Sequence, residues 1–271
     1  MKFSVVAAAL CAVILAAPLS AQSCKSITAV PYAIWTSGSY CVANDLNYTG
    51  NGTAIDIRNN HVILDLGGFH LRITGANTAT GISNALPTRD TIIRNGHIDG
   101  FQTGLLLDNA QNLTLENIVI DDAQQEGADI NGVDVLLRNV TVRGTVGSIT
   151  GVNALGSQWE LDRVHVGGSF GWGLIDSVSR SWTHDSYFAG QTLAVGMYNP
   201  SHTLQNNQLW TTGNGASVAV CGVTCTAIVS GNTLGGATTN ALNITGSAKY
   251  RNNTAQGNLA YVGGTDGGGN Q

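Results

Sequence analysis

Apolar and polar residues alternate over short runs along most of the chain, and glycine and asparagine interrupt these runs. Beyond residue 21, no segment sustains the 3.6-residue period of an amphipathic helix. A period of two is typical of β-strands whose two faces meet different surroundings. The pattern therefore predicts an all-β protein.

One short element recurs at a nearly constant spacing. Alternating apolar residues precede a polar residue and a turn residue, usually asparagine, and another apolar pair follows. The turn residues are Asn95, Asn117, Asn139, Arg163, Asp185 and Asn207, which lie 22, 22, 24, 22 and 22 residues apart. Such a unit has room for two or three short strands and none for a helix. It therefore predicts one coil of a solenoid with stacked parallel strands.

Leucine-rich repeats have a similar length and also carry an asparagine, so they are the alternative solenoid. They need a Leu-x-Leu-x-x-Asn spacing, whereas here a single residue separates the last inward apolar residue from the asparagine. Several core positions are isoleucine or valine, which suit strands. The repeat resembles that of the right-handed parallel β-helix family, the pectin-lyase-like superfamily, over residues 54–253. The resemblance implies a single-domain right-handed parallel β-helix solenoid of about nine coils of about 22 residues.

The segments outside the repeat suggest four parts. Residues 1–21 combine Lys2, an apolar run and a small-x-small ending, which indicates a secretory signal peptide. The apolar run is too short to span a membrane, so we expect no membrane span after cleavage and a secreted or periplasmic protein. Residues 22–53 are expected to cap the solenoid, residues 54–256 to form the β-helix, and residues 257–271 to form a flexible glycine-rich tail.

Four cysteines remain once the leader has been removed, an even number in an oxidising compartment. We expect Cys24 to pair with Cys41 and Cys221 to pair with Cys225. The Cys221–Cys225 spacing without a neighbouring set of ligands is weak evidence for a metal. The sequence thus favours two structural disulfides.

Charge is sparse, because only 11% of the residues are charged, against about 25% in a typical soluble domain. The formal net charge of −5 offers no basic surface, which argues against a nucleic-acid partner. No glycine-rich phosphate loop precedes a helix, so nothing indicates a nucleotide cofactor.

The register predicts which side chains point outward. Residues one and three positions after each turn residue should point inward, and those two and four positions after it should point outward. Stacking then places Asp99, Asp121 and Arg143 in one exposed row, with Asp122 just beyond. A neighbouring exposed row holds His97, Val119, Thr141, His165 and Tyr187.

Two carboxylates one coil apart could ionise separately, as glycoside hydrolysis requires. The catalytic candidates are therefore Asp99, Asp121, Asp122, Arg143 and His165, with His97 and Tyr187 as substrate-binding candidates. The acidic cluster resembles that of β-helical polygalacturonases, but the Asn-Thr-Asp, Gly-His-Gly and Arg-Ile-Lys elements of that family are absent. Pectate lyases, which share the fold, use an Arg or Lys base and usually calcium, and no lyase motif is complete here.

A structural interpretation competes with the catalytic one, because aspartate is common at turns and on solvated faces. The residues before the turns alternate in sign and suggest a ladder of ion pairs: Arg94, Glu116, Arg138, Asp162 and His184. Exposed tryptophans and tyrosines, among them Trp182, could also stack on sugar rings.

The sequence supports two functions and leaves open whether the protein is an enzyme. One is a secreted or periplasmic protein that binds and cleaves a uronic-acid-type polysaccharide, as a lyase or hydrolase. The other is a non-catalytic adhesin, scaffold or carbohydrate-binding β-helix, which the short loops favour. The expected partner is a polysaccharide or cell-surface glycan. No cofactor is expected, apart from calcium if the protein is a lyase.

Overall fold

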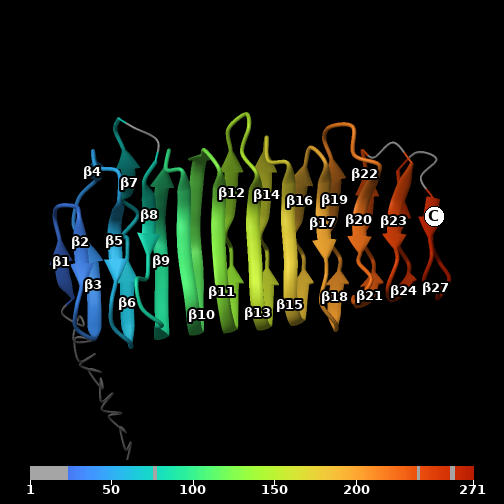
Figure 1. The fold of residues 1–271 in the computed structure, drawn as a ribbon, viewed down its shortest axis with the longest axis horizontal. Coiled ribbons are helices and arrows are strands. Elements are labelled where there is room, and N and C mark those ends of the chain that lie inside the picture. Colours follow the sequence, from blue (N-terminus) through green and yellow to red (C-terminus); the bar gives the residue numbers. More distant parts are fainter. Residues whose placement is uncertain (1–23, 76–77, 237–238, 257–259) are drawn as a thin grey trace, which may run out of the picture.

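Twenty-seven β-strands and no helix make up the part of the chain that the structure, a computed structural model, describes. That part comprises residues 24–75, 78–236, 239–256 and 260–271, so the predicted leader, residues 1–21, lies outside it. The strands pair in parallel from coil to coil and stack along one long axis (Figure 1). The described chain is a right-handed parallel β-helix of about ten turns, which confirms the predicted fold class. None of the described residues belongs to a helix that could cross a membrane.

Three stacks of strands run along the rod, and we call their outer surfaces face 1, face 2 and face 3. Several long strands bend at the corners and contribute to more than one stack. Face 1 contains β2 (Tyr32–Ile34), β5 (Thr53–Ile57), β8 (Thr80–Ser83), the first parts of β10 (Thr103–Ala123), β11 (Glu126–Arg138), β13 (Thr150–Asp162) and β15 (Trp172–His184), and β17 (Leu193–Met197), β20 (Ser217–Cys221), β23 (Asn240–Ile244) and β26 (Ala260–Val262).

Faces 2 and 3 complete each coil. Face 2 contains β1 (Lys25–Ile27), β3 (Gly38–Val42), β6 (Val62–Asp65), the first part of β9 (Arg89–Asp99), later parts of β10, β11, β13 and β15, and β18 (His202–Gln205), β21 (Thr226–Ser230), β24 (Ser247–Arg251) and β27 (Thr265–Asp266). Face 3 contains β4 (Leu46–Tyr48), β7 (His70–Ile73), the ends of β9 and β10, and β12 (Thr141–Gly144), β14 (His165–Gly168), β16 (Tyr187–Gly190), β19 (Gln208–Thr211), β22 (Thr233–Gly235) and β25 (Thr254–Ala255).

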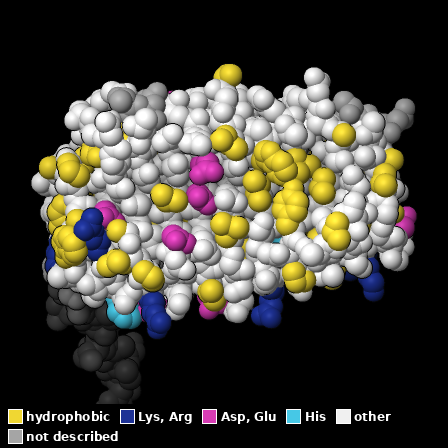
Figure 2. Space-filling view, viewed as in Figure 1, with side chains coloured by type: hydrophobic (Ala, Val, Ile, Leu, Met, Phe, Trp, Pro, Cys, Tyr) yellow, Lys and Arg dark blue, Asp and Glu magenta, His cyan; other side chains and the backbone are white. Residues whose placement is uncertain are grey.

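The core confirms the predicted register of the repeat. Residues one and three positions after the turn residue are at most 1% exposed, namely Ile118, Ile120, Val140, Val142, Val164 and Val166. Each packs on its counterparts one coil above and below, which gives one continuous apolar core. On the side of the molecule shown in Figure 2, few side chains are charged, in keeping with the low charge content.

Left-handed residues make the corner between faces 2 and 3. Asn95, Asn117 and Asn139 have φ values of 58°, 54° and 53°, and Arg163 and Asp185 occupy the same position. Asparagine and aspartate tolerate this conformation because their short polar side chains bond locally. In the next coil the left-handed residue is Asn206, with φ 55°, so the turn residue predicted at position 207 was one position late.

Asparagines form two different ladders. On the surface, Asn117 Nδ2 donates to Asn95 Oδ1 at 3.2 Å, and Asn139 Nδ2 donates to Asn117 Oδ1 at 3.1 Å. Inside the C-terminal coils, at the position that Ile118 fills earlier, buried asparagines donate from Nδ2 to the next Oδ1. This inner ladder runs through Asn207, Asn232, Asn253 and Asn270 with distances of 3.0, 3.0 and 3.2 Å.

Both ends of the rod differ from the sequence expectation. The segment expected as a cap, residues 22–53, contributes β1 to β4, which pair in parallel with strands of the following coils. The expected flexible tail, residues 257–271, contains β26 and β27, which continue the stacks. Backbone pairing needs no particular side chain, so glycine-rich chain can extend an existing stack. The two expected disulfides, Cys24–Cys41 and Cys221–Cys225, are both present.

Candidate functional site

The predicted acidic cluster lies on face 3 in the expected register. Asp99 at the end of β9 is the direct partner of Asp121 in β10, one coil further along. His97 heads the neighbouring row, in which His165 of β14 pairs with Tyr187 of β16. The structure therefore meets the geometric condition for coupled carboxylates and leaves the catalytic role a prediction.

Arginines accompany both carboxylates. Arg72 Nε lies 3.0 Å from Asp99 Oδ2, and Arg143 Nη1 lies 2.7 Å from Asp121 Oδ1. Along the rod the charges thus run positive, negative, negative, positive, which is a ladder that stabilises the register. Asp122 is set apart from this ladder, because it occupies an exposed left-handed position with φ 53°.

His165 and Tyr187 stack at 4.6 Å between ring centroids, at an interplanar angle of 13°. Burial lowers the pKa of His165, and the nearby Arg143 lowers it further. The lowered pKa favours the neutral imidazole of His165 over the cation, which makes His165 a poor cationic partner for an anionic sugar. Both side chains line a hollow of about 630 Å³.

The expected ladder of alternating charges is confirmed in part along face 2: Glu116 makes none of the ion pairs found among the described residues, and Arg94 pairs with Asp65 instead. Arg94 Nε lies 2.8 Å from Asp65, and Arg138 Nε lies 3.3 Å from Asp162. His184 Nδ1 lies 3.0 Å from the neighbouring Asp185, because the left-handed conformation of Asp185 brings the two side chains together. Two groups on the described chain present ligand atoms suited to a metal: His70, His97 and Asp99, and Asp162, His184 and Asp185.

A groove of about 900 Å³ lies on face 2. Left-handed residues of the face 1–face 2 corner line one edge: Asn112, Asp134, Gln158, Arg180 and Ser201. A row of outward residues in register lines its base: Thr114, Leu136, Glu160, Trp182, Thr203, Ile228 and Lys249. Seven coils spaced by about 4.8 Å make it roughly 29 Å long.

Trp182 is the largest side chain exposed in this groove. It is 44% exposed, as the sequence predicted, whereas Trp159 in the preceding coil is 3% exposed. The indole of Trp182 stacks on the His184 ring at 4.0 Å, which holds its orientation. Arg180 and Lys249 are exposed and make no ion pair within the described residues. The sequence analysis singled out Trp182 but did not predict the groove. The base and the edge of the groove are formed by different positions of the repeat, so no single row of residues reveals it.

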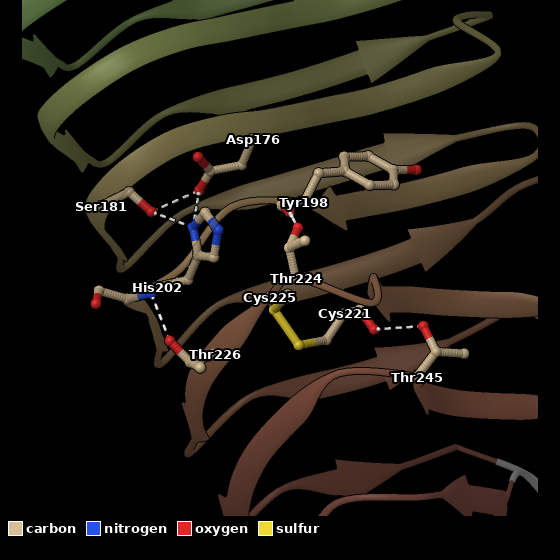
Figure 3. The surroundings of a disulfide bond; sticks show 10 residues. Asp176, Ser181, Tyr198, His202, Cys221, Thr224, Cys225, Thr226 and Thr245 are labelled. Carbon is tan, nitrogen blue, oxygen red and sulfur yellow. Dashed lines mark hydrogen bonds and ion pairs between the residues drawn. A yellow bond between two sulfur atoms is a disulfide. The ribbon is translucent and has the colours of Figure 1, made fainter.

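Figure 3 shows a buried polar cluster of Asp176, Ser181 and His202, of which Ser181 and His202 also belong to the groove lining. Ser181 Oγ donates to Asp176 Oδ2 at 2.6 Å, and His202 Nδ1 lies 3.0 Å from the same oxygen and 2.7 Å from Ser181 Oγ. In a serine hydrolase, the serine and the aspartate face opposite nitrogens of the histidine. Here Ser181 and Asp176 both face Nδ1 of His202, so the cluster is not a nucleophilic triad. It supplies hydrogen-bond partners to the buried carboxylate of Asp176.

Face 1 carries a separate acidic group. Burial raises the pKa of Glu126, and the Asp129 carboxylate raises it further. Burial is also the main cause that raises the pKa of Asp129; the hydrogen bond that Asn153 donates at 2.9 Å acts the other way, and Asp108 adds to the increase. The group lies outside the groove of face 2 and outside the hollow beside His165 and Tyr187.

Comparison with known proteins gives the fold. No family model and no curated protein matches the sequence. The Dettilon tailspike protein is similar in structure, with a TM-score of 0.64 and 11% identity; the match covers 92% of this chain and 58% of the tailspike, so the chain spans little more than half of that protein. The A-module of Azotobacter vinelandii mannuronan C-5 epimerase AlgE6 has a TM-score of 0.58 and 13% identity, with 91% of this chain and 90% of the module covered. The corresponding AlgE4 module has a TM-score of 0.56 and 12% identity, with 92% and 89% covered.

Proposed function

We propose that the protein binds an extended acidic polysaccharide along the groove of face 2. The observation that carries this proposal is the exposed Trp182 in the middle of a long, open groove. A flat indole suits the apolar C–H face of a sugar ring, and polar side chains around it suit the ring hydroxyls. Thr114, Gln158 and Thr203 supply such groups along the same groove.

In the C-terminal half of the groove the charges favour a polymer with carboxylate groups, whereas the carboxylates of Asp134 and Glu160 line its N-terminal half. Arg180 and Lys249 lie in its C-terminal half and are not neutralised by an ion pair within the described residues. A guanidinium and an ammonium bind carboxylates by charge-assisted hydrogen bonds. Uronic-acid units repeated along the polymer would place carboxylates within reach of both.

The comparisons are compatible with this substrate class. The two epimerase modules are named for mannuronan, a polymer of uronic acid, and share the fold over most of this chain. Two disulfides and the predicted leader also favour an oxidising compartment, so we propose a secreted or periplasmic location.

Binding is tested by titrating the protein calorimetrically with size-defined acidic oligosaccharides and with neutral ones of equal length. We expect the acidic series to bind with an affinity that falls as salt rises. Losing both cations in Arg180→Ala/Lys249→Ala should weaken binding by up to about thirtyfold, at up to ~1 kcal/mol per exposed charge pair. Arg89→Ala is the matched control, because Arg89 is exposed on face 2 outside the groove. Equal binding of neutral oligosaccharides, or an equal loss in the control, would contradict the proposal.

Cleavage of a polysaccharide on face 3, at a site separate from the groove, is the second candidate function, and one observation favours it. Asp99 and Asp121 are direct partners on adjacent coils, as a pair of interacting carboxylates must be. We therefore keep Asp99, Asp121, Asp122, Arg143 and His165 as candidate catalytic residues, and His97 and Tyr187 as contacts to substrate. The arginine beside each carboxylate favours the non-catalytic alternative.

A further inference from the structure

Two histidines and an aspartate meet on face 3 at the N-terminal side of the predicted cluster. His70 of β7 is the register partner of His97 of β9, and their rings stack at 4.3 Å with an interplanar angle of 19°. His70 Nδ1 lies 2.6 Å from Asp99 Oδ2. One ligand atom from each of the three residues lies within 4.8 Å of the other two, and all three residues are half-buried.

We propose that His70, His97 and Asp99 bind a divalent transition-metal ion, of which Zn²⁺ is the best fit. Imidazole nitrogen and carboxylate oxygen are common zinc ligands, and three protein ligands leave a fourth position for water or another ligand. Calcium takes oxygen ligands only, so two imidazoles disfavour it. His97 is available as a ligand, because its ring nitrogens make no hydrogen bond to any described residue.

Binding requires a local rearrangement that the structure defines. A ligated ion lies in the plane of each imidazole, whereas the His70 and His97 rings are stacked, so one ring must turn about its Cβ–Cγ bond. The ligand atoms lie within 4.8 Å of one another and must come to about 3.4 Å, the separation that Zn–N bonds of ~2.0–2.1 Å impose in a tetrahedron. His70 Nδ1 and Asp99 Oδ2, which are 2.6 Å apart, must therefore separate if His70 binds through Nδ1. Both residues are half-buried on face 3, so the rotation takes place at the outer side of the stack.

Arg72 competes with the metal for Asp99. Its Nε lies 3.0 Å from Asp99 Oδ2, the same oxygen that His70 contacts. A fixed positive charge beside the site repels a divalent cation and occupies one of its ligands. Removing this guanidinium should therefore tighten metal binding, an effect opposite to that expected for a residue that stabilises the site.

The test is equilibrium dialysis of the protein against Zn²⁺ and Co²⁺, with metal analysis and the visible spectrum of the Co²⁺ form. We expect one saturable equivalent of metal, a loss of at least tenfold in affinity for His97→Gln and for Asp99→Asn, and a gain of several-fold for Arg72→Ala. His165→Gln is the matched control, because His165 lies in the same exposed row but stacks on Tyr187. Circular dichroism checks that each variant is folded. If His97→Gln does not fold, the affinity of Asp99→Asn for the metal provides the test.

Three results would overturn the proposal. The first is the absence of saturable binding of one equivalent. The second is an equal loss of affinity in His165→Gln. The third is binding that persists in His97→Gln and disappears in His184→Gln, which would place the metal at the group formed by Asp162, His184 and Asp185.

Discussion

Replacing Trp182 by alanine should remove most of the contribution that stacking makes to polysaccharide binding. Trp182 lies in the centre of the groove base, between Glu160 and Thr203 of the adjacent coils. Its ring is held by stacking on His184 at 4.0 Å, so little rotamer entropy is lost when a sugar covers it. The change leaves the backbone ladder of β15 intact.

The magnitude follows from the exposed area of the indole. Trp182 is 44% exposed. Of a tryptophan surface of ~250 Å², this leaves about 110 Å² open to solvent. A sugar ring on one side covers about half of it, and ~55 Å² at ~25 cal/mol per Å² contributes about 1.4 kcal/mol. That free energy corresponds to a loss of affinity of about tenfold.

The assay is calorimetric titration of Trp182→Ala and Trp182→Phe with an acidic oligosaccharide that spans the groove. Phenylalanine should retain most of the affinity, because it keeps an aromatic face. Trp35→Ala is the control, since Trp35 is 60% exposed and stacks with Arg58 away from the groove. Unchanged binding by Trp182→Ala, or an equal loss by Trp35→Ala, would refute the reasoning.

Three further predictions follow from the same structure. On uronic-acid polysaccharides, with and without calcium, we expect binding without formation of unsaturated or reducing ends; product that disappears in Asp121→Ala would instead establish cleavage. Asn232→Ala should lower the free energy of unfolding by about 3 kcal/mol in urea titrations, because the buried hydrogen-bond partners of Asn232 in the inner ladder are left unsatisfied. The control Asn44→Ala, at an exposed position, should change the free energy of unfolding by less than ~0.5 kcal/mol. Glu126→Gln should raise the urea midpoint of unfolding at pH 7, and this gain in stability should disappear near pH 4. An equal effect in Asp122→Asn would refute the conclusion that burial of Glu126 raises its pKa.

The sign of the Glu126 effect follows from linkage. Its pKa in the folded protein is raised above the ordinary value of 4.5, so the folded state binds the proton more tightly than the unfolded state. Stability linked to this group therefore rises as the pH falls through the raised pKa, and the ionised carboxylate is unfavourable at neutral pH. Glutamine removes the charge and with it the pH dependence.

The sequence was sufficient to predict the repeat and its register, because in a solenoid each coil imposes the same alternation on the next. The burial of Ile118 and Val140 and the pairing of Asp99 with Asp121 follow directly from this rule. The rule weakens where the repeat changes. At Asn206–Asn207 both residues are asparagine, and only the backbone conformation distinguishes the exposed turn residue from the buried one.

The groove and the histidine pair could not be derived from the repeat alone. The groove is formed between the left-handed corner residues, such as Asp134 and Arg180, and the row of outward residues that lines its base. Its depth depends on how far the corner residues project beyond that row. His70 was missed because its coil lacks the regular turn, and two glycines, Gly67 and Gly68, take the left-handed conformation there. The segment before the first regular repeat was likewise expected as a cap, since its irregular spacing conceals strands that pair in register.

A crystal structure of the protein with a bound acidic oligosaccharide tests the central claim most directly. The account predicts sugar rings along face 2, with one ring stacked on Trp182 and carboxylates within hydrogen-bond distance of Arg180 or Lys249. An oligosaccharide bound instead on face 3, over Asp99 and Asp121, or on face 1 would contradict it.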